Sequence, residues 1–129
     1  MRKRPPDRRT SWTQKVRIGG QVFYLGFGEY EDGSLAELFI DASKEGTYVR
    51  GILGAFARLS SVALQHEVPV EEVAKCLRDC NFPPQGQVEG SPAVAECTSV
   101  VDWIAQEAEV AYGRKEGGEN PNTNTTLPT

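Results

Sequence analysis

The chain has 129 residues, enough for one small domain, and its 39% hydrophobic and 25% charged residues are typical of a globular protein. No apolar run reaches the ~18 residues of a membrane-spanning helix, and no apolar signal core follows the basic start, so we expect a cytoplasmic protein. Three cysteines without dense spacing do not form a disulfide framework.

Charge is distributed unevenly along the chain. Seven of the 14 basic residues precede Ile18, where Asp7 is the only acid, and the rest of the chain carries 7 basic and 17 acidic residues. Pro5 and Pro6 interrupt the first segment, which favours an extended conformation. We therefore expect a basic arm over residues 1–12 joined to an acidic body.

Apolar residues alternate with polar ones in three successive runs, which predicts a three-stranded antiparallel meander. Gly19-Gly20 supplies the positive φ of a two-residue hairpin turn, and a second turn over residues 31–34 precedes the third run. The alternating residues are Val16 and Ile18, then Phe23, Leu25 and Phe27, then Ala36, Leu38 and Ile40.

The apolar spacing then becomes helical and predicts a helix over residues 47–66. Pro69 suits the first position of a second helix, because a proline there loses no hydrogen bond. We expect its buried face to carry Val73, Cys76, Leu77 and Cys80, and residues 82–86 to end it and open a loop.

A third helix has two candidate starts, Ser91-Pro92 and Ser99. The serine at 99 with an acid three residues later, Asp102, forms a capping box and favours the second start. Val101, Ile104 and Ala108 would then face inward. Beyond Tyr112 the chain is polar and rich in glycine, so residues 113–129 are predicted to be a disordered tail.

These elements predict an α+β domain over residues 13–112, with the meander followed by two to three helices packed on one face. Such a layer needs a further surface to complete its core. We expect a second copy of the chain, in a homodimer, to supply it through aromatic residues that we expect to be exposed. They are Phe23, Phe27, Phe39, Tyr24, Tyr30, Trp12 and Trp103.

Several short motifs follow one another in an order that resembles a known domain. They read T-x-K-V-x-I-G-G (13–20), E-Y-E-D-G-S-L-A-E-L-F-I (29–40), K-E-G-T (44–47), G-A-F-A-R-L-S-S-V-A-L-Q (54–65), V-P-V-E-E-V (68–73), F-P-P-Q-G-x-V-E-G (82–90) and S-V-V-D-W-I (99–104). Over residues 6–110 the chain resembles the C-terminal TSCPD domain of adenosylcobalamin-dependent, class II ribonucleotide reductases. It also resembles small free-standing proteins that carry this domain alone.

The chain departs from the family string T-S-C-P-D, because Val100 and Val101 replace its Cys-Pro pair. By this resemblance, the reductase has a large catalytic barrel with a radical cysteine and a cobalamin pocket. A chain of 129 residues is too short to hold such a barrel. The reductase's C-terminal redox cysteine pair has no counterpart after Tyr112. The resemblance therefore implies a non-catalytic protein, accessory or regulatory in nucleotide reduction, that binds a nucleotide or a reductase subunit. We expect no enzyme activity, cofactor or metal.

A candidate phosphate site lies at residues 44–50. Gly46 can turn the chain and Thr47 suits an N-cap, which by itself explains the segment as an ordinary helix start. Alternatively, the free amides at this start bind an anion, with Lys44 and Arg50 adding positive charge and Glu45 lying between. The chain would then be a free-standing protein that sequesters or senses a nucleotide.

Two further groups of residues offer candidate sites. Cys76, Cys80, Cys97 and His66 offer zinc ligands, but the register of the first two with Val73 indicates buried structural cysteines. The arm offers a less favoured nucleic-acid site, since the acidic body would repel a long polyanion. Its residues are Arg2, Lys3, Arg4, Arg8, Arg9 and Trp12.

Overall fold

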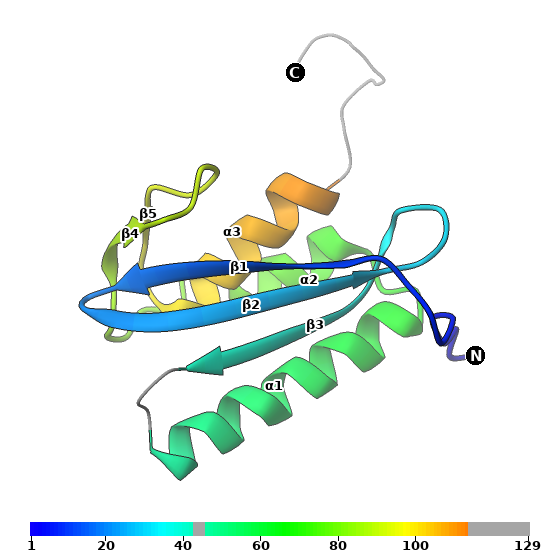
Figure 1. Cartoon of the computed structure of the whole chain (residues 1–129), viewed down its shortest axis with the longest axis horizontal. Coiled ribbons are helices and arrows are strands. Elements are labelled where there is room, and N and C mark those ends of the chain that lie inside the picture. The colour runs from blue at the N-terminus through cyan, green and yellow to red at the C-terminus, as the bar shows by residue number, and fades with distance from the viewer. Residues whose placement is uncertain (43–45, 114–129) are drawn as a thin grey trace, which may run out of the picture.

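The computed structural model describes residues 1–42 and 46–113 (Figure 1). The predicted meander is confirmed and consists of β1 (Ser11–Ile18), β2 (Gln21–Glu29) and β3 (Leu35–Ala42). Helices α1 (Thr47–Gln65), α2 (Val70–Leu77) and α3 (Val100–Tyr112) follow in the predicted order, so the α+β class is confirmed. The predicted tail lies outside the described residues, apart from Gly113.

Two short strands in the segment that the sequence assigned to a loop extend the sheet. They are β4 (Gly86–Glu89) and β5 (Glu96–Cys97), and the strand order is β3-β2-β1-β4-β5. Only Arg17 and Ile18 of β1 pair with β4. Pairs this short leave almost no alternating pattern in the sequence, which explains why they were missed.

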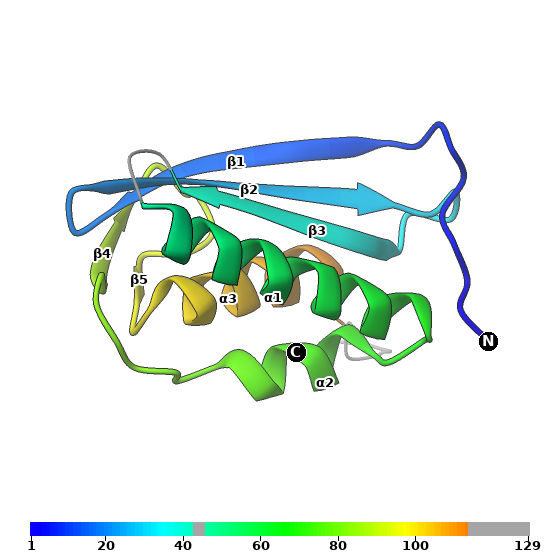
Figure 2. The same ribbon diagram turned by 90° about the horizontal axis from the view of Figure 1, so that it is seen from below.

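The helices lie on one side of the sheet, with α1 and α3 next to it and α2 further away (Figure 2). The alternating residues of the meander point to that side, and Ile18, Leu25 and Phe27 are completely buried there. Trp103 and Ile104 of α3 are buried in the same core. In the described part of the chain, no helix has the length and apolar character needed to cross a membrane.

Helix α1 covers the edge strand β3, whose outer backbone groups have no neighbouring strand (Figure 1). The Ser61 hydroxyl accepts a hydrogen bond from Leu38 N at 3.0 Å and donates one to Leu38 O at 3.2 Å. Gln65 Nε2 donates to Ala36 O at 3.1 Å. These side chains protect the edge from pairing with another strand.

The aromatic residues that favoured a second copy are mostly not exposed. Phe23, Phe27 and Trp103 are buried, because α3 supplies the surface that the sequence analysis assigned to a partner. Phe39, which is 54% exposed, and Tyr24, which is 38% exposed, point to the other face of the sheet. The expected exposure was therefore wrong for three residues, and the homodimer stays a prediction.

The expected buried face of α2 was wrong for its two cysteines. The helix starts one residue after Pro69, which takes the N-cap position, and it ends at Leu77, so Cys80 lies beyond it. Ala74 is its buried residue, Val73 and Leu77 are half-buried against the core, and Cys76 is exposed. The helix faces the core with the stripe i, i+3, i+4, i+7 that begins at Val70, which leaves Cys76 outside it.

Candidate functional site

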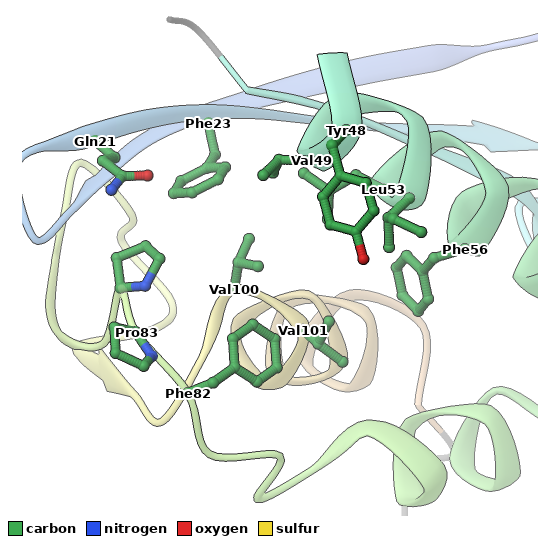
Figure 3. A pocket seen from close by; sticks show the side chains of 12 residues that line it. Gln21, Phe23, Tyr48, Val49, Leu53, Phe56, Phe82, Pro83, Val100 and Val101 are labelled. Atoms are coloured by element: carbon green, nitrogen blue, oxygen red, sulfur yellow. The ribbon is translucent and has the colours of Figure 1, made fainter. Parts of the chain in front are cut away.

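A cleft of about 530 Å³ opens between the first half of α1, residues 82–84 and the start of α3. Figure 3 shows side chains of α1 on one side of it, facing Phe82 and Pro83 across the opening. None of the described residues that line the cleft is charged, and Gln21 and Tyr48 contribute its polar side-chain groups. It is therefore suited to an uncharged, largely apolar group.

The cleft exposes large apolar side chains to solvent. Tyr48 is 80% exposed, Ile52 is 55% exposed and Phe82 is 42% exposed. Covering one such side chain contributes about 1.5–3 kcal/mol, and a contiguous exposed group of them marks an interaction surface.

Helix α1 carries a sequence signal for this surface, which was missed among the predicted sites. Leu53, Ala57 and Leu64 form the stripe that faces the core. Val49 and Ile52 extend the apolar surface beyond that stripe and line the cleft. An apolar stripe wider than one core-facing side indicates a second contact surface.

The retained serine and aspartate of the family string hold the start of α3 in place. Ser99 is the N-cap, as predicted, and its hydroxyl accepts a hydrogen bond from Asp102 N at 3.0 Å. The Asp102 carboxylate accepts bonds from Asp79 N at 2.9 Å, Thr98 N at 3.0 Å and Gln106 Nε2 at 2.9 Å. It also pairs with Arg78 Nε at 3.1 Å. Asp102 therefore joins the end of α2 to the start of α3.

The hydrogen bonds to Asp102 determine its acidity. Burial by itself would raise the pKa of this carboxyl, but the amides of Asp79 and Thr98 stabilise the charged form. With further bonds from Gln106 and Arg78, the net effect is a pKa below the ordinary value. Asp102 thus acts as a structural anion.

The two valines that replace the Cys-Pro pair of the family string lie at the cleft. Val100 is buried and Val101 is half-buried, and both contribute to its wall (Figure 3). The departure from the family string therefore removes a thiol and adds apolar surface at this position.

The structure partly describes the candidate phosphate site. Arg50 N donates to Gly46 O at 3.1 Å, so Gly46 is the N-cap of α1 and Thr47 is its first residue; Thr47 as the cap was wrong. Gly46 has φ −70°, which needs no glycine. Lys44 and Glu45 lie outside the described residues.

Arg50 has a carboxylate partner next to the start of α1. Its Nε lies 3.1 Å from Asp41 Oδ1, and its Nη2 lies 3.3 Å from Asp41 Oδ2. Both side chains are more than half exposed, so solvent screens the pair. A phosphate at this point would have to compete with Asp41.

The residues of the basic arm contact the domain. Arg2 Nε donates to Gln65 Oε1 at 2.6 Å, and the Arg9 guanidinium pairs with Glu37. The Lys3 ammonium lies 4.7 Å from the centroid of the Tyr30 ring. Arg4 and Arg8, the remaining arginines of the arm, are exposed.

Trp12 is part of β1 and lies in the domain. Its indole Nε1 donates to Tyr112 Oη at 2.8 Å, and its ring lies 5.0 Å from that of Phe27 between centroids. Burial, together with the bond to Glu29, raises the pKa of Tyr112 well above its ordinary range, so the phenol stays protonated. Trp12, expected to be part of a nucleic-acid-binding arm, is thus engaged in contacts within the domain.

The candidate zinc ligands are not gathered at one point. Within residues 1–42 and 46–113, no group of three or more histidine, cysteine or acidic side chains has the arrangement of a metal site. Cys97 is buried, and burial raises the pKa of its thiol. Cys76 and His66 are exposed.

Comparison with known proteins relates the chain to one family. The TSCPD domain model matches residues 1–111. The vitamin B12-dependent ribonucleotide reductases of Bradyrhizobium diazoefficiens and Agrobacterium fabrum are each 40% identical over 111 residues, which cover 86% of this chain and 9% of the reductase. That of Rhodopirellula baltica is 34% identical over 98% of this chain and 13% of its own length. No solved structure gives a significant match.

Proposed function

Since the chain belongs to the TSCPD family, we propose that it is a non-catalytic accessory protein in ribonucleotide reduction that binds a reductase chain. The proposal includes the cytoplasmic location and the homodimer expected from the sequence. The apolar cleft between α1 and residues 82–84 is the observation that carries it.

The lengths of the relatives support a binding role. The chain spans about a tenth of the reductases that it matches, which therefore join this region to a much longer polypeptide. An exposed apolar cleft on so small a domain suits a contact with such a polypeptide. In a free-standing chain, the same cleft would bind a separate reductase chain.

Changing Ile52→Glu in the cleft should abolish this binding. The side chain lines the cleft and is 55% exposed, so the variant should fold but would bury an unpaired carboxylate in the complex. We expect the dissociation constant to rise about 100-fold or more. Isothermal titration calorimetry measures this change. The binding partner is the Bradyrhizobium reductase from which the matching region has been removed, so that its docking surface for this region is vacant.

Leu59→Glu is the matched control for this titration. Leu59 also lies on α1 and is 72% exposed, but it is not part of the cleft. The control should bind as tightly as the unchanged chain. Absence of binding by the unchanged chain, or equal binding by the Ile52→Glu variant, would contradict the proposal.

The second candidate function is nucleotide binding at the start of α1, as in a sequestering or sensing protein. The helix start offers free amides, and Arg50 lies one turn into the helix. Because Arg50 is paired with Asp41, we expect this site to bind phosphate more weakly than a site with an unpaired cation.

A thermal-shift panel of ribonucleotides and deoxyribonucleotides tests this second site. If it binds phosphate, a nucleotide at 100 times its dissociation constant stabilises the fold by about 2.7 kcal/mol. Lys44→Ala and Arg50→Ala should each reduce the shift, because each removes a positive charge near the phosphate. A shift that survives both changes rules out this location.

A further inference from the structure

A second groove, of about 540 Å³, runs between α1 and the edge strand β3. Helix α1 lies alongside β3 in Figure 1. Phe39 and Glu37 of β3 line one side, Arg58 and Leu59 of α1 line the other, and Arg2 of the arm lies at one end. This groove is separate from the apolar cleft, with which it shares no lining residue.

The groove is positively charged although the chain has a net charge of −4. The described part of the chain places no carboxylate in ion-pair contact with Arg58 or Arg2. The single acid of the groove, Glu37, is already paired with Arg9. The Arg58 guanidinium is therefore available to an anion. Arg2 donates its Nε to Gln65 Oε1 at 2.6 Å, and its charge is not paired with a carboxylate. The planar fork of a guanidinium suits phosphate.

Phe39 adds an exposed aromatic ring beside these charges. A Cβ on Gly26 would lie 3.5 Å from Phe39 Cδ2, an ordinary contact distance, so the ring packs beside this residue of β2. The side chain remains 54% exposed. An exposed ring next to arginines is the combination that binds a base together with its phosphates.

An extended peptide fits this groove less well than a small ligand. A peptide that binds by strand addition needs the free backbone groups of an edge strand. Ser61 and Gln65 already bond to the backbone of β3 at Leu38 and Ala36. The volume of the groove lies within the ~300–1,000 Å³ of small-molecule sites.

We infer that the groove between α1 and β3 binds a nucleotide unit, with the base on Phe39 and the phosphates on Arg58 and Arg2. The ligand is a free nucleotide or a unit of a single strand, since both present the same chemistry. Neither the docking of a reductase in the cleft nor a phosphate at Arg50 is needed for this binding.

Titration calorimetry with ATP, adenosine and inorganic triphosphate tests the inference. ATP should bind more tightly than adenosine or inorganic triphosphate, because its base and its phosphates contact different residues of the groove. Arg58→Gln should weaken ATP binding about tenfold or more, as expected for the loss of a charged hydrogen bond. Phe39→Thr should weaken it by a similar factor through lost stacking.

Arg17→Gln serves as the control, because it removes an exposed arginine that lies outside the groove. It should leave ATP binding unchanged. Arg50→Ala, which removes the cation at the start of α1, distinguishes the groove from the candidate phosphate site there. A ten-nucleotide dT strand that binds with the same dependence on Arg58 and Phe39 would identify a single strand as the source.

Several results would overturn the inference. They are absence of ATP and dT binding at millimolar concentration, triphosphate binding as tight as that of ATP, and binding that survives Arg58→Gln and Phe39→Thr. Loss of ATP binding in Arg50→Ala alone would also overturn it and would move the site to the start of α1. So would a dimer that dissociates on Phe39→Thr, since a second copy would then cover the ring.

Discussion

Asp102→Ala should lower the free energy of unfolding by about 3 kcal/mol or more, because it leaves buried donors without an acceptor. The carboxylate is 3% exposed and accepts bonds from the amides of Asp79 and Thr98. Those amides cannot turn to another partner without moving the end of α2 or the start of α3. Urea unfolding followed by far-ultraviolet circular dichroism measures the loss.

Glu109→Gln is the control for this variant. Glu109 pairs with the same arginine, Arg78, but its side chain is 35% exposed. Breaking an exposed pair costs at most about 1 kcal/mol. A loss in Asp102→Ala no larger than that in Glu109→Gln would show that Asp102 does not hold the two helices together.

The same carboxylate gives stability a defined dependence on pH. The pKa of Asp102 is lower in the folded chain than in the unfolded one, so its contribution is fully present above the unfolded value of about 3.9. It is lost as the pH falls through the lower, folded value. The difference in unfolding free energy between the unchanged chain and Asp102→Ala should therefore shrink below about pH 4.

Trp103→Ala should lower the free energy of unfolding by about 3–5 kcal/mol, the usual range for truncating a large buried aromatic. The side chain is completely buried, and its indole Nε1 donates to Glu107 Oε2 at 2.8 Å. Glu107 is 4% exposed and also accepts a bond from Ser91 Oγ at 2.6 Å. Truncation therefore leaves both a cavity and a buried carboxylate with one donor fewer.

Trp103→Phe separates the two effects. It keeps most of the apolar volume but removes the donor to Glu107, which should cost about 1–3 kcal/mol. Urea unfolding by circular dichroism compares both variants without relying on the lost indole. A loss below 1 kcal/mol in Trp103→Ala would mean that the core closes around the cavity, contrary to the tight packing expected here.

The sequence was sufficient for the elements whose signals are local. The alternation from Val16 to Ile40 gave the meander, because side-chain period two is a property of any strand. The capping box at Ser99 gave the start of α3, because a cap involves residues three apart. The order of short motifs also identified the TSCPD family.

The local signals did not predict which surface each element presents. The pattern of α2 was compatible with a buried Cys76, and only the approach of α3 shows that the helix faces the core with Ala74 instead. Likewise, the sequence places both Phe23 and Phe39 in predicted strands. One is buried and the other is exposed, since the helices cover only one face of the sheet.

By itself, the sequence determined the three strands of the meander, the helices, the cap of α3 and the family, since each depends on neighbouring residues or on motif order. Only the tertiary structure revealed the apolar cleft beside Ile52 and the basic groove beside Phe39. Both surfaces combine side chains from segments far apart in the chain, and their relative placement follows from how the helices pack on the sheet. No local pattern encodes that placement, because burial of the shared core decides it.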